Sequence, residues 1–222
     1  MRKLLLGLFL LPGAGIAADK AVDRVTTATT VMTEIMSAPD KGVPSDLLEK
    51  AECVAVVPSM KKAGFIVGAK YGVGVVTCRT NGRKAWSAPA TIRIEGGSFG
   101  LQIGGSGTDV VLLVMNQSGA EKLMASKFTL GGDASVAGGP VGREATAQTD
   151  AQMHAEILSY SRSRGLFAGI SLDGSTLRPD NDANKELFGK EVDYKDILTG
   201  KVPAPASTKG FLTTLAKYAG PK

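Results

Sequence analysis

Hydrophobic and polar residues alternate along much of this chain, and a period of two is typical of β-strands whose two faces differ. The pattern is clear in residues 157–164, where one side carries Leu158, Tyr160, Arg162 and Arg164 and the other Ile157 and three serines. Gly165 interrupts it, and residues 166–172 predict a second strand that ends at the turn pair Asp173-Gly174. Two strands therefore meet at a junction that carries two arginines among small hydroxyl groups.

Other segments also predict strands: 53–57, 63–79 (one bent strand or two), 84–94, 96–107, 109–116 and 128–139. Asn81-Gly82 separates two of these segments and is a strong signal for a β-hairpin. Pro58 is expected to end the strand at 53–57, which leaves residues 59–62 as a basic turn.

Helical spacing of apolar residues predicts an amphipathic helix over residues 18–37 that ends at Ala38-Pro39. Its polar side is not rich in Lys or Arg, so packing on the core is favoured over a place at a membrane surface. Shorter helices are predicted from Ser45, from a capping box at Ser118, after Asp180 and around Phe211. These elements predict an α+β fold, an antiparallel β-rich domain with an N-terminal helix and short peripheral helices.

The first 18 residues have the three parts of a secretory signal: basic Arg2 and Lys3, a short apolar run, and small residues for cleavage near Ala17 or Ala18. No Cys stands at the cleavage point, so no lipid anchor is expected, and no other stretch is long enough to span a bilayer. We therefore expect a periplasmic or secreted protein. The predicted organisation is a signal peptide at 1–18, an N-terminal helix and linker at 19–42, the main domain at 43–205, and a tail with a short helix at 206–222.

The net charge of the 222-residue chain is +5, and removal of Arg2 and Lys3 lowers it to +3. That mild basic balance is far from the footprint of a nucleic-acid-binding protein, so no nucleic-acid partner is predicted. Residues 100–107 are rich in glycine, but they lack both the dinucleotide-binding spacing and the lysine of a phosphate loop. Nucleotide binding is not predicted either.

Catalytic and metal-binding patterns are absent from the sequence. His154 is the only histidine, so neither a catalytic triad nor a two-histidine metal site can be built in the usual way. No serine lies in a nucleophile-elbow motif. The aspartates at 173, 180 and 182 suit turns and helix caps better than a calcium site. We predict no catalytic residue, no metal and no cofactor.

Cys53 and Cys78 are the only cysteines. Export to an oxidising compartment would favour a single disulfide between them, and the alternative is two buried thiols on separate strands. Closing a loop of this size would stabilise the fold by roughly 3 kcal/mol at best.

Small groups of basic residues are the candidate binding elements. We predict that Lys61, Lys62, Arg143, Arg162 and Arg164 contact anionic lipid. Arginine forks and backbone N–H groups at glycine turns are suited to a phosphate head group. The alternative is that each group is a solvated strand end, and an anionic surface becomes attractive only if folding gathers several of them on one face.

Several long motifs resemble one family. VPSDLLEKA (43–51), GLQIGGSGTDVVLLVMN (100–116), FTLGGDASVAGGPVGR (128–143) and SYSRSRGLFAGISLDGS (159–175) follow the order and spacing of the SYLF domain, also called the Ysc84 actin-binding domain. The resemblance implies a non-enzymatic domain that binds membrane phospholipids, notably phosphoinositides, and in fungal members also actin filaments. With its predicted signal peptide, the chain resembles an exported bacterial member.

The first hypothesis is therefore a non-enzymatic lipid-binding domain that contacts anionic phospholipids at a membrane surface. The alternative is a protein-interaction or structural envelope protein, with actin binding as in fungal relatives. An enzyme is the least supported of the three classes because the usual catalytic constellations are missing.

Overall fold

The computed structural model describes residues 19–37, 42–64, 67–99, 107–141, 154–163, 166–170 and 172–219. The predicted signal segment, residues 1–18, lies outside these ranges, and so do Arg143 and Arg164. Most of the glycine-rich segment at 100–107 is likewise outside them.

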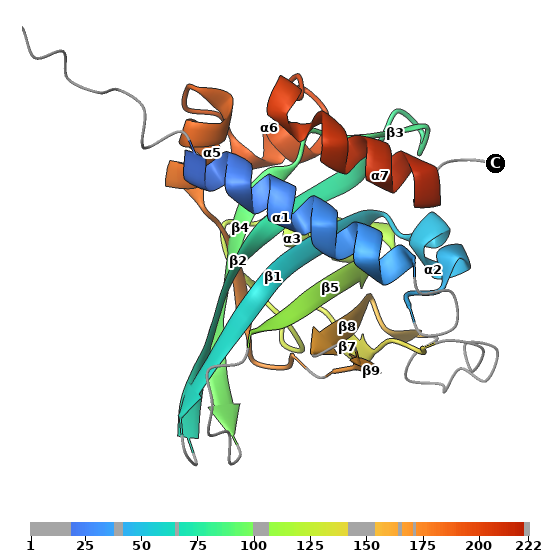
Figure 1. Ribbon diagram of the computed structural model, residues 1–222, viewed down its shortest axis with the longest axis vertical. Helices are drawn as coiled ribbons and strands as arrows, with labels where there is room; N and C mark the ends of the chain where they lie inside the picture. The colour runs from blue at the N-terminus through green and yellow to red at the C-terminus, as the bar shows by residue number, and fades with distance from the viewer. Residues whose placement is uncertain are drawn as a thin grey trace, which may run out of the picture.

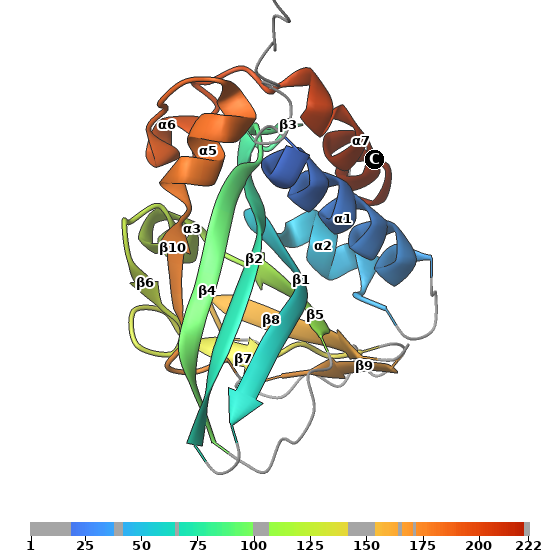
Figure 2. The same ribbon diagram turned by 60° about the vertical axis from the view of Figure 1, so that its left-hand side comes forward.

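Within these ranges, ten strands form one strongly curled sheet (Figures 1 and 2). They are β1 (Cys53–Gly64), β2 (Val67–Thr80), β3 (Ala85–Trp86), β4 (Ala90–Phe99), β5 (Thr108–Val114), β6 (Phe128–Thr129), β7 (Val136–Gly138), β8 (Ile157–Ser163), β9 (Leu166–Gly169) and β10 (Thr176–Pro179). The order is β6-β10-β4-β2-β1-β5-β8-β7, with β3 beside β2 and β9 beside β8. Strands β7 and β8 are parallel, whereas the long central pairs are antiparallel.

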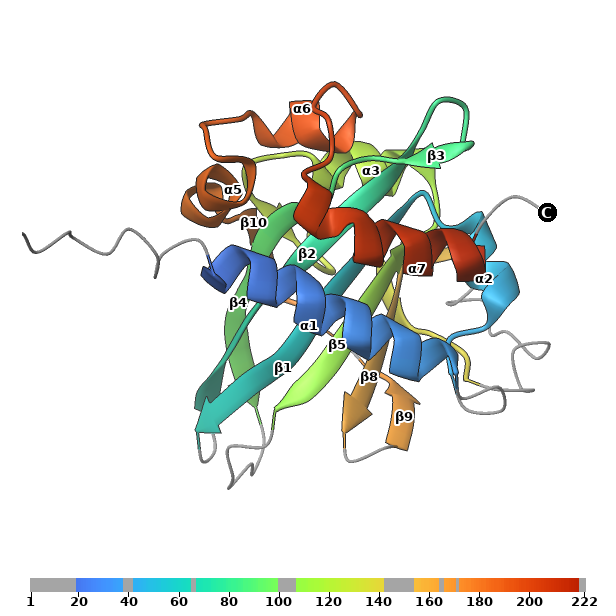
Figure 3. The same cartoon turned by 45° about the horizontal axis from the view of Figure 1, so that its top comes forward.

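The helices lie around one end of this sheet (Figure 1). They are α1 (Asp19–Met36), α2 (Ser45–Lys50), α3 (Gln117–Leu123), α5 (Asn181–Phe188), α6 (Tyr194–Leu198), the 3-10 turn η2 (Ala206–Thr208) and α7 (Lys209–Ala219). Helices α1 and α7 run side by side across the strands (Figure 3). The predicted α+β class and N-terminal helix are confirmed. Among the described residues, the helices are too short or too polar to span a bilayer.

The sheet has a hydrophobic core on each face because its strand side chains alternate. Residues such as Val54, Val56 and Val111 face the helices, where they meet Val25 and Ile35 of α1. Their neighbours in sequence face the inside of the curl, as the next paragraph shows. The packing of α1 on the core, favoured by its weakly basic polar side, is confirmed.

The inner face of the curl is the second core. Ala55, Val57, Ile92 and Leu112 belong to it, and α3 and α6 add residues at its ends, including Leu123 and Ile197 in the same cluster. Both cores share strands β1, β2 and β5, which explains why these strands read as almost continuous apolar runs in the sequence.

Strand β1 does not end at Pro58, so the prediction of a basic turn at residues 59–62 is wrong. The strand continues to Gly64, and a β-bulge lies between Val57 and Met60. Ser59 adopts a positive φ of 48° in this bulge, and its N–H donates to Asp109 Oδ1 at 2.9 Å. A bulge accommodates a residue that lacks an N–H, which is why proline is tolerated inside this strand.

Two predicted strands are divided, and two predicted caps are displaced. The segment at 84–94 splits into β3 and β4, and the segment at 128–139 splits into β6 and β7. Helix α2 has Pro44 as its N-cap rather than Ser45, and α3 is capped by Asn116 rather than Ser118, because the Asn116 side chain accepts from Gly119 N. The cap of α5 at Asp180 and its end at Gly189, with φ of 69°, agree with the prediction.

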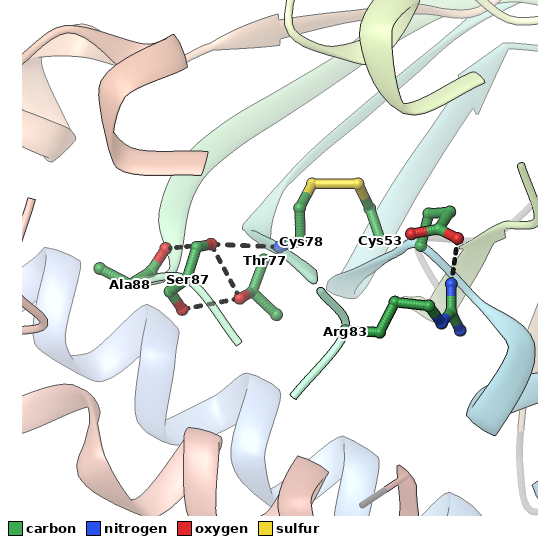
Figure 4. Close-up of a disulfide and its surroundings, with 7 residues drawn as sticks. Cys53, Thr77, Cys78, Arg83, Ser87 and Ala88 are labelled. Atoms are coloured by element: carbon green, nitrogen blue, oxygen red, sulfur yellow. Dashed lines mark hydrogen bonds and ion pairs between the residues drawn. A yellow bond between two sulfur atoms is a disulfide. The ribbon is translucent and has the colours of Figure 1, made fainter. Parts of the chain in front are cut away.

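A disulfide joins Cys53 and Cys78 where β1 and β2 approach the helices (Figure 4). The two residues are direct partners in the antiparallel ladder, and both are buried. Beside the bridge, Thr77 Oγ1 donates to the Ser87 carbonyl at 2.8 Å, and Cys78 N donates to Ser87 Oγ at 3.1 Å. Arg83 forms an ion pair with Glu52 on the other side. These contacts hold the β2–β3 hairpin against the start of β1.

Candidate functional site

The ends of β1, β2 and β4 extend past the helices, which leaves part of the sheet's helix-facing side uncovered (Figures 1 and 2). In the ladder, Lys61 lies opposite Tyr71, and Tyr71 lies opposite Glu95. Tyr71 is 50 % exposed. Among the described residues, it is the one large hydrophobic side chain that is exposed. An aromatic ring on an uncovered sheet face is a common centre of a protein interface.

Basic residues share the face of the sheet that carries this ring. Arg93 of β4 lies directly opposite Arg178 of β10, and Val73 of β2 lies opposite Arg93 on the other side. Arg93 Nε is 3.3 Å from Glu95 Oε1, and their side chains are 40 % and 42 % exposed. Like charges in opposite positions of a ladder repel each other, so an acidic partner would relieve this repulsion.

We call this surface the free strip and define it by six residues: Lys61, Tyr71, Val73, Arg93, Glu95 and Arg178. It holds three cations and one carboxylate around a half-exposed tyrosine. The pattern suits a binding surface, because Arg and Tyr are enriched where interfaces gain most of their energy.

The basic residues predicted from the sequence do not gather on one face, as far as the structure describes them. Lys61 is exposed on the free strip, whereas Lys62, the next residue of β1, points to the inner side of the curl and is only partly exposed. Arg143 and Arg164 lie outside the described residues. Lipid binding through these residues stays a prediction.

Arg162 is held in internal ion pairs. Its Nη2 lies 2.8 Å from Asp109 Oδ2 on the neighbouring strand β5, and it also pairs with Glu34 of α1. Burial opposes the charge, but the hydrogen bonds that Arg162 donates to the two carboxylates outweigh it and raise the pKa of Arg162. This arginine therefore fastens α1 to the sheet.

Replacing Arg162 by methionine is expected to lower the free energy of unfolding by about 2 kcal/mol, since Asp109 would be left without its cationic partner in a mostly buried place. Urea denaturation measures the change. Lys185→Met, which breaks the exposed ion pair with Glu191, is the matched control and should have little effect. Equal losses for the two variants would contradict the structural role of Arg162.

Tyr71, Arg93 and Arg178 were missed by the sequence reasoning. The period of two in a strand could have indicated that residues 71, 73 and 75 of β2 share one face, and likewise residues 93 and 95 of β4. However, only the register of three strands from distant parts of the chain brings Tyr71, Arg93 and Arg178 together.

A groove between α5 and α6 is a concave feature of the described surface. Lys185, Glu191, Asp193 and Tyr194 line it. Part of its charge is engaged, because Lys185 Nζ lies 2.9 Å from Glu191 Oε1 and Asp193 caps α6. Burial raises the pKa of Tyr194, so its hydroxyl stays neutral. The groove has no exposed aromatic ring comparable to Tyr71 among the described residues.

No group of three or more His, Cys, Asp or Glu in the described part of the chain could hold a metal ion. The structure is of a definite class: a mixed α+β domain with a curled sheet, a helix layer on part of one face, and an aromatic, cationic strip on the rest. Within that class, the chain belongs to the Ysc84 family, whose model, described as "Las17-binding protein actin regulator", matches residues 95–218.

Curated relatives agree with this assignment. The chain is 39 % identical over 190 residues to the SH3 domain-containing YSC84-like protein 1 of Rattus norvegicus, which covers 84 % of this chain and 55 % of the rat protein. The human protein of the same name is 37 % identical over the same length. LAS seventeen-binding protein 3 of Saccharomyces cerevisiae (strain S288c) is 36 % identical over 183 residues, 81 % of this chain and 39 % of the yeast protein. The chain thus spans about half the length of these animal relatives, and less of the yeast one.

Proposed function

We propose that this chain is a non-enzymatic protein-interaction domain that binds actin filaments or a protein of the actin-regulating machinery through the free strip. The family description names actin regulation and Las17 binding, and the names of the relatives describe binding proteins. The half-exposed Tyr71 beside the opposed pair Arg93 and Arg178 is the observation that carries the proposal.

The chemistry of the strip favours an acidic protein surface. Guanidinium groups bind carboxylates through paired N–H donors, and Arg178 makes no ion pair with any described carboxylate. Tyr71 supplies a rigid apolar surface with a polar tip, at a small cost in side-chain entropy. An exposed ring on the same face as Arg178 is therefore better suited to an acidic partner than the helix-covered remainder of the sheet.

Replacing Tyr71 by alanine is expected to weaken binding to actin filaments by about tenfold or more, because central aromatic residues commonly dominate interface energy. Co-sedimentation of the purified chain with filaments, titrated over filament concentration, measures the affinity. Tyr218→Ala, which removes a tyrosine on α7 outside the strip, is the matched control and should bind as the wild type does.

Two results would reject parts of the proposal. If the wild-type chain does not sediment with filaments, actin is not its partner. If it sediments and Tyr71→Ala has the wild-type affinity, the free strip is not the binding surface.

An anionic phospholipid membrane is the second candidate partner. Lys61 and Tyr71 lie side by side on the strip, and an aromatic ring next to cations also suits the interface of an anionic bilayer. Flotation with vesicles of phosphatidylcholine alone, and with added phosphatidylglycerol, separates this candidate from a protein partner. Equal flotation with both vesicle types would reject it.

Export is also part of the proposal. The pattern of residues 1–18 supports it. N-terminal sequencing of the mature protein, expressed from the full chain in a secreting host, should begin near Asp19. A product that retains Met1 would reject export.

A further inference from the structure

The groove between α5 and α6 has the size of a ligand site. Its volume is about 480 Å³, which lies in the usual range for pockets that hold small molecules or short peptide segments. Its lining comes from four parts of the chain: the residues after α3, the end of β10, α5, and the segment that leads into α6. Figure 2 shows α5 and α6 together above the end of β10. A ligand in the groove would therefore contact elements that are distant in sequence.

Part of the lining is apolar. Met124 and Val192 are partly buried and pack against the inner core of the sheet, and Pro179 also lines the groove. Tyr194 belongs to the lining too, and only 6 % of this residue is exposed. Its hydroxyl is buried and has no hydrogen-bond partner among the described residues. Buried hydroxyl groups normally have a partner, and a ligand in the groove can supply the one that is missing here.

The charged part of the lining is acidic in balance. Three carboxylates and two ammonium groups line the groove, from Asp182, Glu191, Asp193, Lys185 and Lys195. The surrounding segment has the same bias, since residues 180–196 contain six acidic residues and three lysines, although the whole chain has a net charge of +5. The groove therefore attracts a cation rather than an anion.

Two of the carboxylates have capacity for a ligand. Glu191 forms the ion pair with Lys185 and is the main cause that raises the pKa of this lysine, while Asp182 contributes only as a more distant charge. Asp182 is exposed and forms no hydrogen bond or ion pair with another described residue. Asp193 Oδ1 accepts from Asp196 N at 3.0 Å, which leaves Asp193 Oδ2 without a described partner. Both carboxylates can thus accept hydrogen bonds from a bound cation.

We propose that the groove between α5 and α6 binds a basic peptide segment, with a lysine or arginine side chain in contact with Asp182 and Asp193. The methylene stem of such a side chain packs on the apolar lining, and its charged head donates to the two carboxylates. The Tyr194 hydroxyl gains a partner from the peptide, either as acceptor or as donor. A peptide suits this lining better than a metal ion does, because a metal ion would gain nothing from the apolar residues.

The groove and the free strip differ in the charge of the partner that suits them. The free strip suits an acidic surface, whereas the groove suits a basic segment, and the two sites share no residue. The inference therefore goes beyond the proposed function, and either one can fail without the other.

Fluorescence anisotropy tests the proposal, with the full chain titrated into a fluorescein-labelled peptide of alternating lysine and alanine at physiological salt. One comparison peptide has norleucine in place of lysine, which keeps the apolar stem and removes the charge. A second has glutamate in place of lysine. The wild type should bind the lysine peptide more tightly than either comparison peptide by about tenfold or more.

Variants of the chain locate the binding. Asp182→Asn should weaken binding of the lysine peptide by about fivefold, because it removes a charge-assisted hydrogen bond. Asp196→Asn removes the same charge from α6 outside the groove and should bind as the wild type does. Tyr194→Phe removes only an unpartnered hydroxyl and should weaken binding by a smaller factor. Asp182 is exposed and the Asp196 side chain is 43 % exposed, so both asparagine variants are expected to fold.

A preference for the lysine peptide that is reduced in Asp182→Asn, but not in Asp196→Asn, supports the groove as the site. The proposal is overturned if the wild type does not bind the lysine peptide or binds the norleucine peptide equally well. It is also overturned if Asp182→Asn and Asp196→Asn have the same effect, since that result would indicate a general attraction to the acidic segment.

Discussion

Alanine at position 74 is expected to destabilise the fold by about 3 kcal/mol, which is a large part of the stability of a typical domain. Gly74 lies in β2 directly beneath the bulge of β1. An added Cβ would stand 2.1 Å from the Val56 carbonyl oxygen and 2.8 Å from Val57 Cα. Both atoms belong to the backbone of a strand paired on both sides, so neither can move away cheaply.

Chemical denaturation of Gly74→Ala and of Gly97→Ala tests this prediction. Gly97 lies in β4 of the same sheet, and an added Cβ there meets nothing within 4 Å. That control should be neutral or slightly stabilising, because alanine restricts the unfolded chain more than glycine does. Similar stability of the two variants would show that Gly74 is not in close contact with the backbone of β1.

Removing the disulfide is expected to cost about 3 kcal/mol, because it closes a loop with a sequence separation of 25 residues. The double variant Cys53→Ala, Cys78→Ala keeps the site apolar while it removes the bridge. The loss should appear as a lower denaturation midpoint, whether unfolding is followed by a probe of secondary structure or by a probe of tertiary structure.

A reductant is the control for this second prediction. Under denaturing conditions that expose the bridge, reductant should lower the midpoint of the wild type and leave the double variant unchanged. Mass measurement before and after reduction establishes how much of the protein carries the bridge. A wild type that is insensitive to reductant, with a variant of equal stability, would contradict the stabilising role of the disulfide.

Local sequence signals predicted most of the elements but not their boundaries. The apolar spacing of α1, the Asp180 cap with Gly189 of α5, and the hairpin at Asn81-Gly82 are each determined by neighbouring residues. The effect of Pro58 was predicted wrongly because it depends on the partner strand. A bulge opposite β5, supported by Asp109, lets β1 continue past the proline. Asn116 caps α3 in place of Ser118. The Ser118 hydroxyl instead donates a hydrogen bond to Glu156 Oε1 at 2.7 Å.

The binding surfaces depend on tertiary structure to a greater degree. Lys61 and Lys62 are neighbours in sequence, yet the strand places them on opposite faces of the sheet. Arg162 looked like a free cation in the sequence because Asp109 and Glu34 are far away along the chain. Conversely, no local feature of the sequence marks Tyr71 as exposed, because its exposure results from where the helices stop covering the sheet.

Site-specific crosslinking tests most directly whether the free strip contacts actin filaments. A photo-crosslinking amino acid is placed at position 71, and in a second protein at position 121, an exposed site on α3 outside the strip. The proposed function predicts a covalent product with actin from position 71 and none from position 121. Products from position 121 alone, or equal products from both positions, would contradict it.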